Sequence, residues 1–128
     1  MVIFMKVRIL LADDQPEVRS ALRLLLEQAS TWVVVGEASD AEELFKSIRK
    51  DCPDVVFLDW ELPNFYGAEH VAGIREICSE VKVVALSSQF ESRNGALECN
   101  VDVFVSKGDP PEKVLDKLGS LFGLPYKK

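Results

Sequence analysis

Five side chains with chemically useful groups follow short apolar runs in this chain: Asp13, Asp14, Asp59, Ser87 and Lys107. If three carboxylates lie within a few ångströms of one another, they repel and need a cation at neutral pH. An all-oxygen site with room for water suits Mg²⁺, with Mn²⁺ as a substitute. A carboxylate can also attack phosphorus as a nucleophile, while a lysine and a hydroxyl contact the phosphoryl oxygens. Together the five groups suit transfer of a phosphoryl group to Asp59, which would hold it as an acyl phosphate.

The elements that must bring these side chains together are strands. Short continuous apolar runs bounded by turn residues predict strands buried on both faces. Five are expected, over residues 7–12, 31–38, 55–59, 81–86 and 101–105. Taken singly, each of the five chemical residues is more simply a solvated surface group. In a parallel sheet, however, the carboxyl ends of the strands share one edge, so we expect all five to converge there.

Apolar residues at helical spacing predict a helix after each strand. The first covers roughly residues 16–28, with Pro16 in its first turn, where the missing N–H costs nothing. Ser39 with Glu42 has the form of a capping box before the second helix.

The fourth helix is predicted to be weak. Ser88 with Glu91 resembles a second capping box, but Asn94-Gly95 falls in the middle of the helix. A glycine there costs about 1 kcal/mol relative to alanine. This weakness is typical of a movable element and also of a merely short helix.

The alternation of strands and helices predicts an α/β fold with a parallel sheet covered by helices on both faces. A chain of 128 residues is long enough for one domain and too short for two. We therefore expect a single domain over residues 1–128, with its core at about residues 6–122.

Composition argues against several classes of function. A net charge of −6 and a pI near 4.8 give a surface that repels phosphate backbones, so direct nucleic-acid binding is not expected. No apolar run approaches the roughly eighteen residues that a membrane span needs. The first residues include no charged leader, and a cytoplasmic location is expected.

The three cysteines lack CxxC spacing and have no histidine cluster nearby. Cys52, Cys78 and Cys99 are therefore predicted to be small hydrophobic residues in a reducing compartment, and neither disulfides nor a zinc site are expected.

Over nearly its whole length, the chain resembles the receiver domain of two-component response regulators, in its stand-alone, single-domain form. The motifs that carry the resemblance are Asp13-Asp14, Phe57-Leu58-Asp59-x-x-Leu62-Pro63-x-x-x-Gly67, Ala85-Leu86-Ser87 and Phe104-x-x-Lys107. The resemblance implies a flavodoxin-like (βα)₅ fold, which is a doubly wound five-stranded parallel sheet in the order 2-1-3-4-5.

The resemblance also assigns roles around the metal. It implies that Asp59 is the phosphoacceptor. Asp14 and Asp59 would ligate Mg²⁺ directly, together with the main-chain carbonyl of Glu61, while Asp13 would act mostly through water.

Around the phosphoryl group, the resemblance implies that Ser87 and Lys107 make direct contacts. Phe104 would be the aromatic switch residue, which turns inward as Ser87 moves toward the phosphate. Glu61 and Gln89 each lie two residues past a site residue, and we hypothesise that they set the rate of autodephosphorylation. Such a domain would accept a group on its own side chain and would not be a classical enzyme.

The sequence departs from the family pattern near the fifth strand. Gly108 follows Lys107 where many receivers have proline, so no cis peptide is assumed there. Asn100 and Val103 stand where glycine is common. Asn100 tolerates the left-handed conformation and can preserve a turn, whereas Val103 cannot easily adopt it.

Three further side chains are given structural interpretations. Trp60 adjoins Asp59 and is expected to rim the pocket, while Trp32 begins a strand and is expected to pack in the core. His70, the only histidine, is expected to be exposed.

The leading hypothesis for function is a phosphorylation-controlled switch. Its donor would be a histidine kinase or a phosphotransfer protein, and its response would appear at the face formed by the fourth helix, fifth strand and fifth helix. A downstream protein, or a second copy in a phosphorylation-dependent homodimer, would bind there. The alternatives are a docking module that is never phosphorylated and the receiver part of a longer DNA-binding regulator. A phosphatase of the Asp-x-Asp type fits less well, because the sequence has Asp59-Trp60-Glu61 at that place. A nucleotide-binding domain also fits less well, because no Gly-rich loop follows the first strand.

Overall fold

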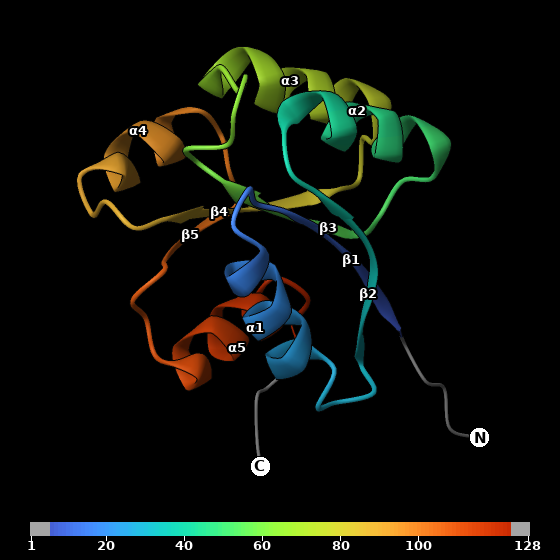
Figure 1. The fold of residues 1–128 in the computed structure, drawn as a ribbon, viewed down its shortest axis with the longest axis vertical. Coiled ribbons are helices and arrows are strands. Elements are labelled where there is room, and N and C mark those ends of the chain that lie inside the picture. Colours follow the sequence, from blue (N-terminus) through green and yellow to red (C-terminus); the bar gives the residue numbers. More distant parts are fainter. Residues whose placement is uncertain (1–5, 124–128) are drawn as a thin grey trace.

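A five-stranded parallel sheet forms the centre of the computed structural model, which describes residues 6–123. The strands are β1 (Val7–Ala12), β2 (Trp32–Ala38), β3 (Val55–Asp59), β4 (Lys82–Ser87) and β5 (Val103–Ser106). Their order is β2-β1-β3-β4-β5, which confirms the predicted flavodoxin-like topology (Figure 1).

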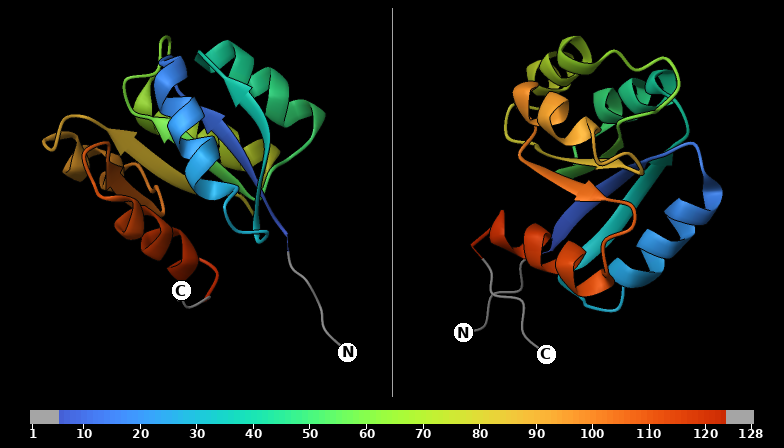
Figure 2. Two further views of the ribbon diagram at one scale, coloured as in Figure 1. Left: turned by 60° about the horizontal axis from the view of Figure 1, so that its bottom comes forward. Right: turned by 90° about the vertical axis from the view of Figure 1, so that its left-hand side faces the viewer.

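Helices cover both faces of the sheet. They are α1 (Pro16–Leu26), α2 (Ala41–Lys50), α3 (Gly67–Ile77), α4 (Ser92–Glu98) and α5 (Pro111–Ser120). Helices α2, α3 and α4 lie on one face, and α1 and α5 lie on the other (Figures 1 and 2). None of the helices within residues 6–123 is long and apolar enough to cross a membrane.

The core has two halves because successive side chains of a strand point to opposite faces. In β3, Val56 and Leu58 pack into the half beneath α2, α3 and α4. Val55 and Phe57 pack into the half beneath α1 and α5. All of β3 is buried, as its unbroken apolar run predicts, and this fixes the position of Asp59 at its end.

The start of α2 differs by one residue from the predicted capping box. Asp40, not Ser39, is the N-cap, and its side chain accepts a hydrogen bond from Glu43 N at 2.8 Å. Glu43 Oε1 in turn accepts from Ser39 N at 2.8 Å. Asp40 thus satisfies the N–H of Glu43, and Glu43 satisfies the N–H of Ser39, the residue before the N-cap. A variant of the capping box is therefore present, one residue later than predicted.

The second predicted capping box is wrong. Helix α4 begins at Ser92, after the N-cap Glu91, and no side chain caps it. The segment before it forms turns instead, with Ser92 N donating to Gln89 O and Arg93 N to Phe90 O. The helix has only seven residues, in keeping with its predicted weakness.

The prediction that all three cysteines are free is also wrong, because Cys52 and Cys78 form a disulfide. Cys52 follows α2, and Cys78 is the C-cap of α3. The parallel topology brings these two helix ends together, with a Cα–Cα distance of 5.7 Å across a sequence separation of 26. Cys99 is free.

The backbone before β5 supports the expectation for Asn100, which has a φ of 67°. Val103 needs no such conformation, because it lies in the strand. No cis peptide bond occurs within residues 6–123, so the Lys107–Gly108 bond is trans.

Candidate functional site

The loop after β1 holds Asp13 rigidly at the edge of the sheet. Asp13 N continues the strand pairing by donating to Ala38 O at 2.9 Å. Its Oδ1 accepts from Gln15 N at 2.8 Å, and its main-chain oxygen accepts from Arg19 Nη1 at 2.6 Å. The residue is only 1% exposed, so its carboxylate points into the protein rather than into solvent.

Asp59 ends β3 and is equally buried, at 1% exposure. Its Oδ1 accepts a hydrogen bond from Glu61 N at 2.9 Å. The intervening Trp60 N donates to Leu86 O at 2.7 Å, which ties the start of the loop to β4. The second carboxylate oxygen of Asp59 is left to face the other charged residues.

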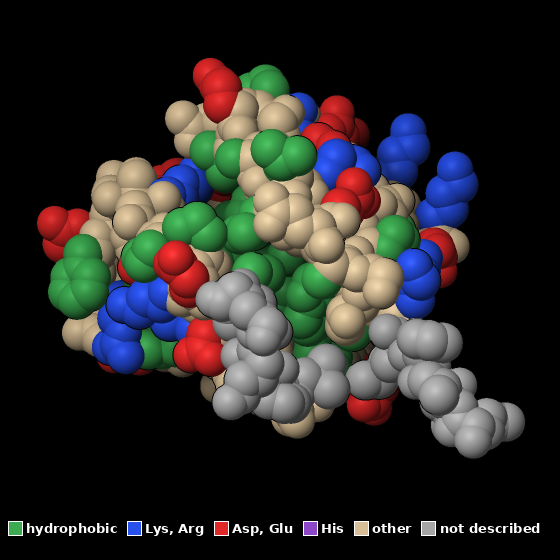
Figure 3. All heavy atoms as spheres, turned by 90° about the horizontal axis from the view of Figure 1, so that it is seen from below, with side chains coloured by type: hydrophobic (Ala, Val, Ile, Leu, Met, Phe, Trp, Pro, Cys, Tyr) green, Lys and Arg blue, Asp and Glu red, His purple; other side chains and the backbone are tan. Residues whose placement is uncertain are grey.

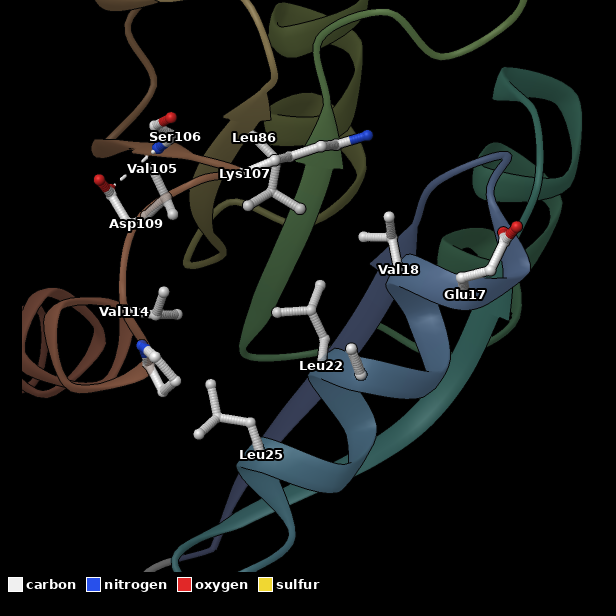
Figure 4. A pocket seen from close by; sticks show the side chains of 12 residues that line it. Glu17, Val18, Leu22, Leu25, Leu86, Val105, Ser106, Lys107, Asp109 and Val114 are labelled. Carbon is white, nitrogen blue, oxygen red and sulfur yellow. Dashed lines mark hydrogen bonds between the residues drawn. The ribbon is translucent and has the colours of Figure 1, made fainter.

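Lys107 brings a positive charge to these two carboxylates. Its Nζ lies 2.8 Å from Asp13 Oδ2 and 3.5 Å from Asp59 Oδ2, and it donates to Gln15 Oε1 at 3.1 Å. Lys107 N donates to Ser87 O at 2.8 Å and so extends the pairing of β4 and β5. In Figure 4, the lysine side chain extends from the end of β5 across the end of β3, away from Val114 and Leu25.

The three aspartates meet the geometric requirement for a shared cation. Asp13, Asp14 and Asp59 each offer a carboxylate oxygen, and these oxygens lie within 4.8 Å of one another. Asp13 Oδ2 is buried and, despite its ion pair with Lys107, accepts no well-directed hydrogen bond from any residue in the described range. Asp14 is exposed and opens the cluster to water. This donor set of hard oxygens, with solvent access, fits Mg²⁺.

The electrostatics of the cluster show how strongly the groups interact. Burial raises the pKa of Asp59 to about 6, and the neighbouring charges of Asp13 and Glu61 also raise it. The Glu61 N–H and the Lys107 ammonium oppose this rise. Burial would lower the pKa of Lys107, but its close contact with the Asp13 carboxylate and the charges of both aspartates outweigh that effect and raise it. The lysine therefore stays protonated.

Ser87 lies at the end of β4 and is completely buried. Its Oγ donates to Glu61 Oε2 at 2.8 Å and accepts from Gln89 N at 2.9 Å. Ser92 Oγ also lies within hydrogen-bond distance of Glu61 Oε2, at 3.4 Å. The loops after β3 and β4 are thus joined through one carboxylate.

The remaining predicted residues lie around this centre. Phe104 is buried in the half of the core beneath α4, so its ring already points inward. The side chain of Gln89 is exposed. Trp60 is partly buried and packs edge-on against Phe65, with ring centroids 5.1 Å apart. Trp32 packs in the core, as predicted, with its ring near Phe122.

His70 is not simply exposed, as predicted, but half-buried. Its ring packs against those of Phe45, Phe65 and Tyr66, at centroid distances of 5.2 to 5.5 Å. Its Nδ1 accepts from Tyr66 N at 2.9 Å. His70 therefore fixes the first turn of α3 and lies outside the acidic cluster.

A groove of about 310 Å³ lies between α1 and the β5–α5 segment, on the α1–α5 side of the sheet, and Lys107 is among its lining residues. Seen from that side, hydrophobic side chains gather in a hollow of the surface (Figure 3). Val18, Leu22, Leu25 and Val114 point into it (Figure 4). Because these walls are apolar and offer few hydrogen bonds, the groove is not suited to phosphoryl chemistry.

Sequence reasoning did not identify Gln15, Arg19 or Ser92 as residues of the site. Gln15 contacts both Asp13 and Lys107, and Arg19 holds the Asp13 carbonyl. The only available signal was the position of Gln15 and Arg19 just after the aspartate pair. Nothing in the sequence places Ser92 near Glu61.

Comparison with known proteins identifies relatives over most of the chain. The family model described as the response regulator receiver domain matches residues 9–119. The response regulator UvrY of Escherichia coli is 31% identical over 118 residues, which are 91% of this chain and 54% of UvrY. The nitrate/nitrite response regulator protein NarL of E. coli is 32% identical over 112 residues, covering 86% of this chain and 52% of NarL. This chain thus spans about half the length of these curated relatives.

Solved structures agree with this match. A two-component response regulator of the LuxR family from Aurantimonas sp. SI85-9A1 superposes with a TM-score of 0.83 at 28% identity, covering 94% of this chain and 88% of that one. The signal receiver domain of a putative NarL from Mycobacterium tuberculosis gives a TM-score of 0.81 at 26% identity, with 91% and 96% covered.

Proposed function

This chain belongs to the response regulator receiver family, and we propose that Asp59 accepts a phosphoryl group from a histidine kinase or a histidine phosphotransfer protein. The observation that carries this proposal is the convergence of Asp13, Asp59 and Lys107 at the carboxyl edge of the sheet. A receiver domain of this kind accepts a group on its own side chain and is not a classical enzyme.

In the proposed reaction, the free oxygen of Asp59 attacks the phosphorus of a phosphohistidine. The new O–P bond forms as the N–P bond breaks, and the departing imidazole takes up a proton. Lys107, held by Asp13 and Gln15, offers a fixed positive charge to the phosphoryl oxygens. Because Asp59 is held by Glu61 N, its nucleophilic oxygen keeps a defined direction.

Mg²⁺ is the proposed cofactor, with Mn²⁺ as a substitute. Asp14, Asp59 and the main-chain carbonyl of Glu61 would hold it directly, and Asp13 would act through water. When bound, the ion neutralises negative charge on the carboxylates and on the incoming phosphoryl group.

After transfer, Ser87 would donate a hydrogen bond to a phosphoryl oxygen, and Phe104 would complete the switch by fixing the packing beneath α4. The response would appear at the face formed by α4, β5 and α5. A downstream protein, or a second copy in a phosphorylation-dependent dimer, would bind this face. Glu61 and Gln89 would border the path of the water that hydrolyses the acyl phosphate and would set its lifetime.

The cellular setting is also a proposal. We propose a cytoplasmic location for this receiver. We also propose that it makes no direct contact with nucleic acid, because its net charge of −6 repels phosphate backbones. Its similar proteins include a DNA-binding response regulator from Staphylococcus aureus. Because the chain spans about half of its curated relatives, a receiver unit of a longer regulator is the second candidate.

The proposal is tested by labelling with acetyl phosphate in the presence of Mg²⁺. The wild-type chain should gain one phosphoryl group, which mass spectrometry would detect as an increase of about 80 Da. Asp59→Asn should abolish the gain. If the wild type gains no label from acetyl phosphate or from any purified histidine kinase, the protein is instead a docking module that is never phosphorylated.

A further inference from the structure

The carboxylate of Glu61 joins three segments around the site. Glu61 lies in the loop after β3, and its Oε2 accepts from Ser87 Oγ at the end of β4, at 2.8 Å. Ser92 Oγ, at the first residue of α4, contacts the same oxygen at 3.4 Å. We infer that Glu61 is a positioning residue that holds Ser87 and the start of α4 in the resting arrangement until a phosphoryl group reaches Asp59.

The first step of the argument is the single proton of Ser87. A serine hydroxyl has one hydrogen to donate, and Glu61 receives it. The lone pairs of the same oxygen already accept from Gln89 N at 2.9 Å. The other acceptor near this hydroxyl is Gln89 O, at 3.2 Å. Ser87 therefore cannot donate fully to a phosphoryl oxygen unless it leaves Glu61.

Burial makes this exchange selective. Ser87 is 0% exposed, so water does not readily take the place of Glu61. A hydrogen bond between a hydroxyl and a charged carboxylate is stronger than one between neutral groups. Only a competing anionic acceptor, such as a phosphoryl oxygen, is well suited to draw the proton away.

The phosphoryl group would also act on Glu61 itself. Glu61 N donates to Asp59 Oδ1 at 2.9 Å, so the residue is held next to the acceptor. A phosphoryl group on Asp59 adds negative charge close to the Glu61 carboxylate, and like charges repel. The group that attracts Ser87 therefore also displaces the present partner of Ser87.

Release of Glu61 would loosen the start of α4. This helix has seven residues, and the side chain of its N-cap residue, Glu91, makes no capping hydrogen bond. A Cβ added at Gly95 would meet nothing within 4 Å, so the outer side of the helix has open space. Within the described residues, the bond from Ser92 Oγ to Glu61 Oε2 is the only side-chain hydrogen bond at this end of the helix.

This inference rests on the acceptor role proposed for Asp59, but its first test needs no phosphorylation. Amide hydrogen exchange across residues 92–98 is compared in unphosphorylated wild type, Glu61→Ala, Glu61→Gln and the control Glu80→Gln, which removes an exposed carboxylate outside α4. Glu61→Ala should exchange about five- to ten-fold faster, the factor expected for the loss of roughly one ordinary hydrogen bond. Glu61→Gln keeps an acceptor oxygen and should change less, and Glu80→Gln should match the wild type. Equal exchange in the wild type and Glu61→Ala would overturn the inference.

The second test measures beryllofluoride affinity in the presence of Mg²⁺. Loss of one negative charge raises affinity for this anion equally in Glu61→Gln and Glu61→Ala. The alanine variant should bind about three-fold more tightly again, because it also frees Ser87. Equal affinities in the two variants would show an effect of charge alone and contradict the inference. If the wild type binds no beryllofluoride, the proposed function fails, and the exchange comparison still decides whether Glu61 holds α4.

Discussion

Lys107 Nζ lies 2.8 Å from Oδ2 of Asp13, a carboxylate that is 1% exposed. The pair joins the end of β5 to the end of β1 and compensates a charge that the protein has removed from water. Because the lysine lies 3.5 Å from Asp59, it also holds the proposed acceptor. The positive charge thus has a structural role as well as a chemical one.

Lys107→Ala should therefore destabilise the metal-free protein. Breaking a buried pair leaves an uncompensated charge and costs about 3 kcal/mol. Urea denaturation in EDTA measures the loss, which should shrink at saturating Mg²⁺ because the ion would compensate Asp13. Lys113→Ala is the matched control, since its lysine is exposed, its contact with Asp109 is longer at 3.7 Å, and Lys117 still pairs with Asp109, so the loss should be less than about 0.5 kcal/mol. Equal losses in the two variants would contradict this role for Lys107.

Asp14→Asn should weaken Mg²⁺ binding by about tenfold or more, since it removes a charged oxygen from the cluster. Trp60 follows Asp59 and packs on Phe65, so its fluorescence should respond to the ion. A titration of fluorescence against Mg²⁺ measures the affinity. Trp60→Phe should abolish the response, because Trp32 lies in the other half of the core. An unchanged Mg²⁺ affinity in Asp14→Asn would exclude Asp14 as a ligand.

Asp59→Asn should stabilise the metal-free protein at neutral pH. Burial raises the pKa of Asp59 to about 6 in the folded state, from 3.8 for a solvated aspartate. The folded state thus binds the extra proton more readily, and this group adds stability as pH falls from about 6 to about 4. Above that window the charged carboxylate costs up to about 3 kcal/mol, which asparagine avoids.

Guanidinium denaturation of both proteins in EDTA, at pH 7.5 and at pH 4.5, checks this sign. The advantage of Asp59→Asn should be fully present at pH 7.5 and fall to about a third of that value at pH 4.5. An advantage that grows toward low pH would contradict the assigned direction of the pKa shift.

The sequence was sufficient to predict the centre of the site. The unbroken apolar run before Asp59 can only be satisfied by burial on both faces, and this fixes the strand and the place of its terminal carboxylate. Asp13 and Lys107 followed by the same logic, because parallel strands share an edge. The strand order came from the family resemblance, since periodicity alone does not select an order.

Features that depend on contacts between loops were not predictable. The disulfide requires Cys52 and Cys78 to meet across two helix ends, and no local pattern reports that distance. The same holds for the bond from Ser87 to Glu61, which joins residues 26 positions apart. The capping box before α2 was displaced because Ser39 and Asp40 are both good N-caps, and tertiary packing selects between them.

Reduction of the Cys52–Cys78 disulfide should lower stability. The bond closes a loop with a sequence separation of 26, and in the chain-entropy model such a loop contributes about 3 kcal/mol. Thermal unfolding with and without dithiothreitol measures the effect. Cys78→Ser should remove the response to dithiothreitol, whereas Cys99→Ser should keep it, because Cys99 is free. Identical unfolding of the oxidised and reduced wild type would show that the bond adds no stability.

Glu37→Gln should lower stability at neutral pH by about 0.5–1 kcal/mol, the range for a partly exposed ion pair. Glu37 bonds to Arg23 at 2.8 Å and Arg19 at 2.6 Å, and these bonds, Arg23 first, lower the pKa of Glu37 below 4.5. A lowered carboxyl pKa contributes stability above the unfolded value of 4.5, and this contribution is lost as pH falls through the folded value. The difference between wild type and Glu37→Gln should therefore be constant from pH 8 to about 5 and vanish well below 4.5, as denaturation at a series of pH values would measure. Because Arg19 also holds the Asp13 carbonyl, the variant should loosen the loop after β1. A difference in stability that persisted at low pH would show that packing, not charge, sets the effect.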